Sequence, residues 1–431
     1  MPRIAFIGAG SVEFTKNLLG DILSFPELAD CQIALHDIDE ERLGVAEQMA
    51  RYTARVLGAD PTIEVCPDRR QALDGADHAI NMIQVGGHPA TLLDFRIPAA
   101  HGLRQTIGDT LGIGGIFRAL RTIPVMLEIG ADMAELCPDA WLLNYTNPMA
   151  MLCWATYAGS PQQRIVGLCH SVQNTTAELA DLAGVPFGDV SFLGAGVNHQ
   201  AFILRFQRAG EDLYPLLDQA IERDPELRRR VRMEIYRRFG YFPTESSEHS
   251  AEYLPWFMRS DEAIEHFRIP VDEYIARSEE NLELYEQMRH RLDAGEEIEI
   301  ERSQEYASLI IHSMLTGQER VIYGNVRNDG LITNLPRGAC VEVPCLVDRN
   351  GVQPTVVGDL PPQLAALNRT FLNVCELTVR AALEGSRDHV HQAALLDPAA
   401  SAALPPDLIA TIVEELIDAH GDALPEGIRR S

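Results

Sequence analysis

Short apolar runs alternate with amphipathic stretches over the first half of the chain. The apolar runs predict strands over Arg3–Ile7, Ile33–Leu35, His78–Val85, Trp141–Tyr145 and Ile165–Cys169. Apolar residues three and four positions apart predict helices over Val12–Leu23, Glu40–Leu57, Ile116–Leu136 with an interruption at Pro124, and Met149–Tyr157. Strands that alternate with helices favour an α/β fold with a Rossmann-type, doubly wound parallel sheet. The carboxyl ends of its strands lie at one edge, where ligands bind in such sheets.

The pattern changes after about residue 195. Val190–Gly194 and Ala201–Phe206 predict two strands that flank a loop carrying Asn198 and His199. Charged helices follow, such as those predicted over Pro225–Arg238 and Asp272–Ala294, and their charge runs indicate solvated faces. We therefore expect a nucleotide-binding domain over residues 1–195 and an α+β domain for substrate and oligomer contacts over residues 196–431. Because no flexible linker is visible, the two should pack closely.

A glycine-containing turn follows the first predicted strand. Gly8 and Gly10 let backbone N–H groups approach a pyrophosphate, and Ser11 precedes a helix whose amino end favours anions. Asp37 ends the next strand and can accept hydrogen bonds from a ribose diol, and an acid there favours NAD over NADP. The third glycine of the usual pattern is absent, since Glu13 takes its place. The combination predicts dinucleotide binding, and the alternative is a plain turn with Asp37 beside a helix cap.

Polar residues gather in four segments near the ends of predicted strands. These segments are Gln84–Gly87, Asn144–Pro148, Gly167–Ser171 and Gly196–Gln200. We expect Cys169 and His199 to reach the ligand edge together. A thiolate and an imidazole can ligate a metal, and their softness favours zinc or iron over manganese. The alternative is that Cys169 is a small buried side chain and His199 a hydrogen-bonded turn residue.

Two more side chains are candidates for proton transfer. His170 lies beside Cys169 and titrates near neutral pH, so it can donate or accept a proton. A structural hydrogen bond at a helix start is its alternative role. Tyr241 lies in the polar segment 240–249. It can act as a base only if a cation or metal lowers its pKa from about 10, and the alternative is a tyrosine that only packs.

Charge and cysteine content narrow the class of protein. The formal net charge of −27 argues against binding to nucleic acid or anionic membranes, because like charges repel without a basic patch. No apolar run reaches the roughly 18 residues of a membrane span. The eight cysteines are scattered and form no C-x-x-C pair, which indicates free thiols in a reducing cytoplasm.

Several long motifs are spread over nearly the whole chain. They are Phe6–Ser11, Gly115–Pro124, Asn147–Met151, Gly167–Gln173, Thr244–His249 and Ile322–Asn328. In these motifs the chain resembles the NAD- and manganese-dependent glycosidases of glycoside hydrolase family 4, specifically their α-galactosidase (melibiase) branch. The resemblance implies that Cys169 and His199 are manganese ligands, that Asn147 contacts a substrate hydroxyl and that Tyr241 is the base.

The resemblance also bears on the substrate. His170 stands where the phosphoglycosidase members carry an aspartate proton donor, which leaves His170 or a water to assist the leaving group. Thr91 takes the place of an arginine that holds phosphate in those members, so the implied substrate is an unphosphorylated α-galactoside. The family also implies a homodimer or homotetramer.

The implied reaction is hydrolysis without net redox change. NAD⁺ removes hydride from C3 of the galactosyl ring, Mn²⁺ polarises the C2 and C3 oxygens, and Tyr241 removes the acidified C2 proton. The aglycone leaves C1, water adds, and the hydride returns to C3, so that NAD is regenerated. The family is an exception to hydrolysis by two carboxylates.

Three alternatives stay open from the sequence. The same fold pattern suits a conventional NAD-dependent hydroxy-acid dehydrogenase of the lactate or malate type, whose C-terminal domain is also α+β. A sibling specificity, such as α-galacturonidase or α-glucosidase, is the second alternative, and a uronic acid would need a cation near C6. A non-enzymatic NAD-binding regulator would not need the polar segments at the strand ends.

Overall fold

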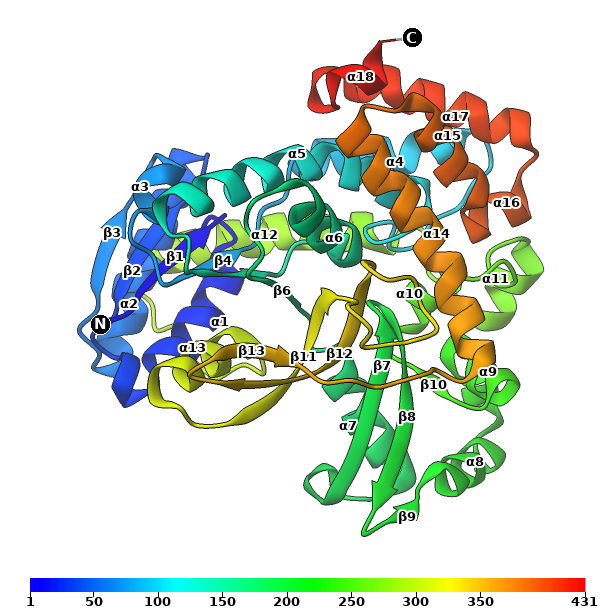
Figure 1. The fold of residues 1–431 in the computed structure, drawn as a ribbon, viewed down its shortest axis with the longest axis horizontal. Helices are drawn as coiled ribbons and strands as arrows, with labels where there is room; N and C mark the ends of the chain where they lie inside the picture. Colours follow the sequence, from blue (N-terminus) through cyan, green and yellow to red (C-terminus); the bar gives the residue numbers. More distant parts are fainter. Residues whose placement is uncertain (431) are drawn as a thin grey trace.

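One mixed β-sheet of 13 strands runs through the computed structural model, which describes residues 1–430 (Figure 1). Six parallel strands come first, in the order β3 (Thr62–Val65), β2 (Gln32–His36), β1 (Arg3–Ile7), β4 (His78–Asn81), β5 (Trp141–Asn144) and β6 (Ile165–Leu168). Every neighbouring pair among them is parallel. This 3-2-1-4-5-6 order is that of dinucleotide-binding sheets, as the alternating pattern predicts.

Antiparallel strands from the second half of the chain extend the same sheet beyond β6. They are β11 (Arg320–Arg327), β12 (Cys340–Asp348), β7 (Val190–Val197), β8 (Gln200–Arg208) and β10 (Phe242–Pro243), with β13 (Gly351–Pro354) on β12 and β9 (Glu211–Asp212) on β8. The sheet is therefore continuous across the predicted boundary near residue 195. The division into two domains stays a prediction.

Helices cover the sheet, with α5 and α6 on its upper side in Figure 1 and α1 and α13 on its lower side. In the first half they are α1 (Val12–Leu23), α2 (Glu40–Leu57), α3 (Arg69–Leu73), α4 (Gly87–Ala100), α5 (Gly112–Leu136), α6 (Met149–Gly159) and α7 (Ser171–Ala183). In the second half they are α8 (Tyr214–Arg223), α9 (Val231–Phe239), α10 (Ser247–Glu252), α11 (Asp261–Phe267), α12 (Glu273–Ala294), α13 (Tyr306–Thr316), α14 (Pro362–Glu384), α15 (Arg387–Leu396), α16 (Pro398–Ala403), α17 (Pro406–His420) and α18 (Glu426–Arg429). No helix in the described residues is long and apolar enough to cross a membrane.

Three predicted elements differ from the structure. The strand from His78 ends at Asn81, because the chain then turns towards α4 through Gly86, whose φ is +80°. Helix α5 begins at Gly112 and continues through Pro124 without the expected interruption. The predicted helix over Pro225–Arg238 is a 3₁₀ turn over Pro225–Arg229 followed by α9.

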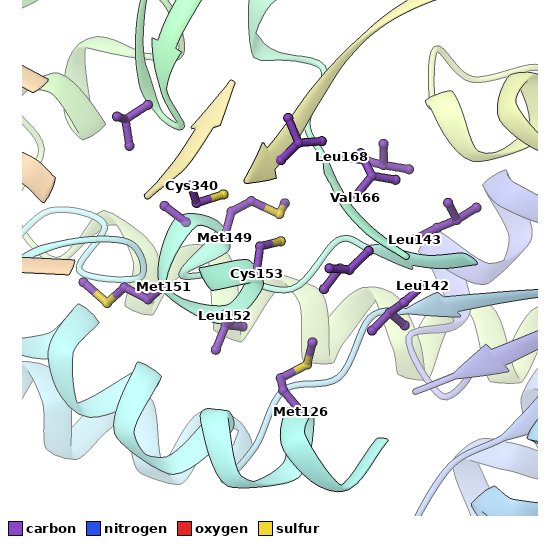
Figure 2. Packing of buried hydrophobic residues seen from close by; sticks show 14 of the residues in the cluster. Met126, Leu142, Leu143, Met149, Met151, Leu152, Cys153, Val166, Leu168 and Cys340 are labelled. Carbon is purple, nitrogen blue, oxygen red and sulfur yellow. The ribbon is translucent and has the colours of Figure 1, made fainter. Parts of the chain in front are cut away.

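The apolar core lies between the parallel strands and the helices above them. Figure 2 shows Leu142 of β5 on the side of Met126 of α5 and Leu152 of α6, whereas Leu143 of β5 and Val166 of β6 point to the opposite face of the sheet; all five are buried. Strands buried on both faces read as continuous apolar runs, which is why the sequence located them. All eight cysteines are free, and seven are buried in the core.

A buried ion pair ties three helices to the loop after β4. Arg121 of α5 donates two hydrogen bonds to Asp94 of α4, at 3.1 and 2.7 Å, and a third at 3.0 Å to the carbonyl of Val85. His420 of α17 lies 2.9 Å from the same carboxylate. The second arginine of the Gly115–Pro124 motif is thus structural.

Replacing Asp94 with alanine should destabilise the protein by about 3–5 kcal/mol, because it leaves the Arg121 charge buried without a partner. Chemical denaturation measures the loss. Glu376→Ala is the matched control, since it removes an ion pair with Arg380 at the surface and should cost less than about 1 kcal/mol. Equal losses for the two variants would contradict the expectation.

Candidate functional site

A cavity of about 350 Å³ opens at the carboxyl ends of the parallel strands. Ser11 after β1, Gln84 after β4, Asn147 after β5 and Cys169 after β6 all line it. The cavity therefore lies at the edge of the sheet that the alternating pattern predicted to bind ligands.

The glycine turn has the geometry of a nucleotide cradle. Gly8 has φ of +90°, and a Cβ there would lie 3.0 Å from the backbone nitrogen of Ile83. The N–H of Gly10 donates a 2.7 Å hydrogen bond to Oδ2 of Asp37, and a Cβ on Gly10 would lie 2.6 Å from that oxygen. The turn thus excludes side chains, leads into α1 after Ser11, and places the acid that can accept a ribose hydroxyl beside the helix start. These residues fit an NAD molecule.

Three possible metal ligands meet at one side of the cavity. Cys169, His199 and Glu245 each offer a ligand atom, and these atoms lie within 4.8 Å of one another. Cys169 follows β6, His199 lies in the turn between β7 and β8, and Glu245 follows β10 with φ of +67°. We call these three residues the metal cluster. Sequence reasoning missed Glu245, although it lies inside the recognised motif Thr244–His249.

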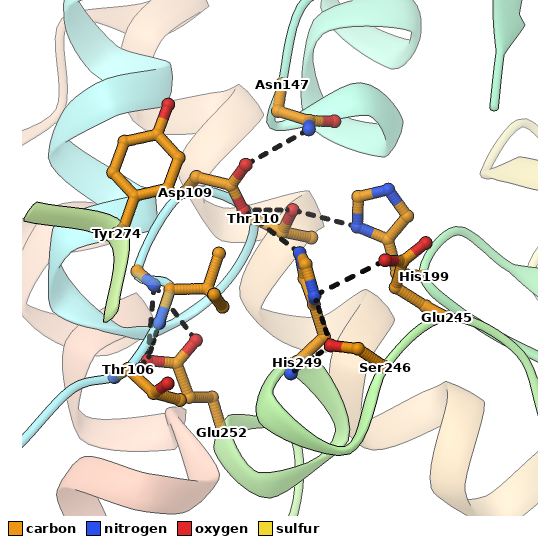
Figure 3. A network of polar contacts seen from close by, with 12 residues as sticks. Thr106, Asp109, Thr110, Asn147, His199, Glu245, Ser246, His249, Glu252 and Tyr274 are labelled. Carbon is orange, nitrogen blue, oxygen red and sulfur yellow. Dashed lines mark hydrogen bonds and ion pairs between the residues drawn. The ribbon is translucent and has the colours of Figure 1, made fainter. Parts of the chain in front are cut away.

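The hydrogen bonds of His199 leave one ring nitrogen free for a cation. The Thr110 hydroxyl donates at 2.8 Å to Oδ1 of Asp109, so its oxygen accepts from Nδ1 of His199 at 3.1 Å (Figure 3). Nε2 of His199 then carries the lone pair that a metal needs. Thr110 and Asp109 precede α5 and were not found from the sequence, because no spacing pattern marks them.

His249 and Asp109 lie next to the metal cluster and connect its residues to the rest of the cavity (Figure 3). Nε2 of His249 lies 3.6 Å from Oδ1 of Asp109, and its Nδ1 lies 3.6 Å from Oε1 of Glu245. Burial alone would raise the pKa of Asp109, but His249, Arg118 and His199 together hold that pKa below its usual range. Asp109 is therefore a carboxylate, and its Oδ2 accepts a 3.1 Å hydrogen bond from the Asn147 side chain.

A buried glutamate fixes the loop that carries Asp109. Glu252 of α10 accepts hydrogen bonds from the backbone N–H groups of Thr106 at 2.7 Å and Gly108 at 2.9 Å. Burial raises the pKa of Glu252 to about 7. The backbone contacts hold the loop against α10, which sets the position of Asp109.

A tyrosine and an arginine line the opposite wall. Nη1 of Arg118 donates a 2.7 Å hydrogen bond to the hydroxyl of Tyr274, and its guanidinium carbon lies 5.2 Å from the Tyr274 ring centre. Nε of the same arginine donates to the carbonyl of Asn147 at 3.2 Å. The first arginine of the Gly115–Pro124 motif thus belongs to the cavity.

Tyr241, the base that the resemblance implied, lies elsewhere. Its ring packs against the apolar cluster that contains Phe202 and Val231, and it does not line the cavity. Tyr274 occupies the cavity instead, at the start of the charged helix that the sequence indicated only as a solvated face. Thr91 also stays outside the cavity: it is buried in α4, and its hydroxyl donates to the carbonyl of Gly87.

His170 lines the cavity beside Cys169 and is half-exposed. Its Nδ1 lies 3.2 Å from Oε1 of Glu305, and this contact raises the pKa of His170 to about 9. Burial, followed by the nearby Glu245 charge, raises the pKa of Cys169 to about 12. A thiol in this position stays neutral at pH 7 unless a cation lies beside it, and a bound metal deprotonates a coordinating thiol.

The sheet order, the glycine turn and the polar cavity define an α/β protein of the Rossmann type, with its cavity at the ligand edge of the sheet. Comparison of the sequence with known protein families identifies its family. Residues 3–185 match the model of the family 4 glycosyl hydrolases, and residues 194–400 match that of the family 4 glycosyl hydrolase C-terminal domain. The chain belongs to the family 4 glycosyl hydrolases.

Two relatives are similar to the chain over nearly its full length. An α-galactosidase of Bacillus subtilis (strain 168) is 46% identical over 431 residues, covering 99% of this chain and all of the relative. An α-galactosidase of Rhizobium meliloti (strain 1021) is 36% identical, covering 98% of this chain and 89% of the relative.

Solved structures share the fold. A 6-phospho-β-glucosidase from Thermotoga maritima, solved with manganese, NAD⁺ and glucose-6-phosphate, has a TM-score of 0.81 at 22% identity, covering 98% of this chain and 99% of its own. A malate dehydrogenase from Plasmodium falciparum in complex with NADH has a TM-score of 0.53 at 14% identity, covering 89% and 99%. The expected fold, a Rossmann-type sheet extended by an α+β part of the lactate and malate dehydrogenase type, is thus confirmed.

Proposed function

We propose that this enzyme hydrolyses terminal non-reducing α-D-galactosyl residues with bound NAD and Mn²⁺. The observation that carries the proposal is that the metal cluster, the end of the glycine turn at Ser11 and the Tyr274 side chain all lie at one cavity. The two full-length relatives named as α-galactosidases support the galactosyl specificity.

The residues present indicate where the two cofactors would bind. Gly8, Gly10, Ser11 and Asp37 would hold NAD, and the metal cluster would hold the divalent ion. Bound together, they supply reversible hydride transfer at C3 and Lewis-acid polarisation of the C2 and C3 oxygens. The thiolate and imidazole alone favoured zinc or iron, and Glu245 adds a hard oxygen ligand that suits manganese.

The chain's own residues would handle the sugar and its protons. Asn147, held by Asp109, would bind a ring hydroxyl. Tyr274 would take the proton from C2, because its side chain lines the cavity and Arg118 fixes its hydroxyl through a 2.7 Å hydrogen bond. We place the base here and not at Tyr241, since Tyr274 lines the cavity and Tyr241 does not. His170, oriented by Glu305, would protonate the departing aglycone oxygen, directly or through a water.

A galacturonide is the sibling substrate with one specific observation in its favour. Arg277 lines the cavity and is a cation that a C6 carboxylate would need. Its Nε, however, already donates to Glu273 at 3.0 Å. Because the negative charge of Glu273 already balances the positive charge of Arg277, the site favours the uncharged C6 hydroxymethyl group of a galactoside.

The decisive experiment omits one component at a time. Hydrolysis of 4-nitrophenyl α-galactoside should require NAD⁺, Mn²⁺ and a reductant, and should exceed hydrolysis of the α-galacturonide and α-glucoside. Deuterium at C2 of the substrate should exchange with solvent. Net NADH formation with a hydroxy acid would instead identify a dehydrogenase, and unchanged cleavage without NAD⁺ would end the proposal.

Two features of the cellular context are also proposals. The free cysteines suit a reducing cytoplasm. The family resemblance suits a homodimer or homotetramer, which light scattering on the purified protein will measure.

Replacing Asp37 with alanine should weaken NAD⁺ binding by about 10- to 100-fold, because hydrogen bonds to a charged group contribute about 1.5–3 kcal/mol. Isothermal titration calorimetry measures the dissociation constant. Asp39→Ala is the matched control, since Asp39 caps α2 through the N–H of Arg42 and should leave the affinity unchanged. An unaltered affinity in Asp37→Ala would remove Asp37 from the NAD site.

A further inference from the structure

Behind the metal cluster, four neighbouring strands align a row of residues. The strand register pairs Gly167 of β6 with Asn325 of β11, Asn325 with Glu342 of β12, and Glu342 with Gly196 of β7. Directly opposite residues on adjacent strands point to the same face of a sheet. The side chains of Asn325 and Glu342 therefore lie next to each other, with a glycine on either side.

Helices α6 and α14 close over this row. A Cβ on Gly167 would lie 2.4 Å from Sδ of Met149, and one on Gly196 would lie 2.8 Å from Oδ1 of Asn368. Figure 2 shows Met149 and Cys153 of α6 beside Cys340, which is two residues before Glu342 and so points to the same face. The row is thus enclosed in the core, and Glu342 has no exposed surface.

The oxygen atoms around this row have no protein partner. Within residues 1–430, neither carboxyl oxygen of Glu342 is hydrogen-bonded, and neither is Oδ1 of Asn198, Asn325 or Asn368, although all four residues are fully buried. Nδ2 of Asn325 donates to the carbonyl of Gly167 at 3.3 Å, and Nδ2 of Asn368 donates to the carbonyl of Gln200 at 2.7 Å. These two amides are therefore turned so that their oxygens, not their N–H groups, stay unpaired.

The Glu342 carboxyl needs a neutralising partner that the protein does not supply. Within residues 1–430, neither carboxyl oxygen of Glu342 contacts a lysine, arginine or histidine nitrogen as an ion-pair partner. Burial raises its pKa to about 7, Glu245 adds to the increase, and His199 and the amides of Asn198 and Asn325 oppose it. A buried carboxylate without a partner is strongly unfavourable.

A cation satisfies this site better than a proton does. A protonated Glu342 would offer one O–H, which can pair with only one oxygen of this set. The other unpaired donors are Nδ2 of Asn198 and Nε2 of Gln200, on the turn that carries His199. A cation is coordinated by several oxygens at once, and carboxylate and amide oxygens are hard ligands. One negative charge among neutral oxygens balances a single positive charge.

We propose that Glu342, Asn198, Asn325 and Asn368 form a second, oxygen-lined cation site that holds a monovalent ion such as K⁺ or Na⁺. The ion would fix the Asn198 side chain and so the turn that carries His199. It would also offset the repulsion between Glu342 and Glu245. The site differs in chemistry from the metal cluster, whose sulfur and imidazole ligands suit a transition metal.

The test compares the full-length protein, loaded with NAD⁺ and Mn²⁺, in KCl, NaCl and tetramethylammonium chloride at equal ionic strength. The thermal unfolding midpoint should fall by at least about 2 °C when the bulky organic cation replaces both alkali ions, because a ligand that binds only the folded state stabilises it. Elemental analysis should find close to one alkali ion per chain after gel filtration in KCl or NaCl, and should find that ion lost after gel filtration in the organic salt.

Glu342→Gln keeps the shape of the side chain and removes its charge. Its midpoint should be the same in all three salts, while the surface control Glu376→Gln should respond as the unmodified protein does. In crystals grown with Tl⁺, an anomalous peak should lie between Glu342 and Asn325. Equal midpoints for the unmodified protein in the three salts would overturn the proposal in favour of water or a proton, even if Glu342→Gln fails to fold. Because the midpoint is read without substrate, this outcome is independent of the α-galactosidase test.

Discussion

Cys169→Ser should abolish hydrolysis of an α-galactoside, with a loss of at least about 10³-fold, while NAD⁺ binding is retained. Lewis-acid polarisation by a metal contributes several kcal/mol, and each 1.36 kcal/mol corresponds to a factor of ten in rate. Cys169 supplies the only sulfur within the group of three ligands. Release of 4-nitrophenol at saturating NAD⁺ and Mn²⁺ measures the activity, and calorimetry measures NAD⁺ binding.

Cys137→Ser is the matched control for this experiment. Cys137 is also a buried thiol, but it follows α5 and does not line the cavity. It should keep nearly full activity. If Cys169→Ser kept the activity of the unmodified enzyme, with its manganese content unchanged, the metal cluster would be wrongly assigned.

Tyr274→Phe should lower kcat by about 10²- to 10⁴-fold, the usual contribution of a general base. The variant keeps the ring that packs against Arg118 and loses only the hydroxyl to which Arg118 donates. Exchange of a C2 deuteron with solvent should slow by a similar factor, which separates loss of the base from loss of substrate binding.

Tyr241→Phe distinguishes the position implied by resemblance from the one in the cavity. Because the Tyr241 ring packs in an apolar cluster, this variant should keep more than about half of the activity. The reverse pattern, with Tyr241→Phe inactive and Tyr274→Phe active, would return the role of the base to Tyr241 and show that the segment 240–249 rearranges on substrate binding.

Much of the parallel sheet could be predicted because local pattern determines it. Helices α1 and α2 have the predicted bounds, and α2 begins after an Asp39 cap and ends before Gly58 in the left-handed conformation. The polar segments after β5 and β6 reached the cavity because every parallel strand delivers its carboxyl end to the same edge. In the antiparallel part, β7 pairs with β8 and β11 with β12 as local hairpins, but the pairings of β6 with β11 and of β12 with β7 join segments that are far apart in sequence and that no local pattern predicts.

The residues that sequence reasoning missed come from places without periodicity. Asp109 lies in a loop that is positioned by Glu252, a residue 143 positions later in the numbering. Tyr274 lies at the start of a charged helix, where its surroundings indicate only solvent. Glu342 lies between two valines in a buried strand, and its partners are set by strand register, which no single segment encodes.

The shared sheet limits how substrate enters. Main-chain pairing of β6 with β11 joins the nucleotide-binding strands to the strands of the second half, at Leu168 with Gly324 and Gly167 with Asn325. A hinge that swung the halves apart would have to break this ladder next to Cys169. A substrate must therefore reach the cavity while the two halves of the sheet stay joined beside the metal cluster.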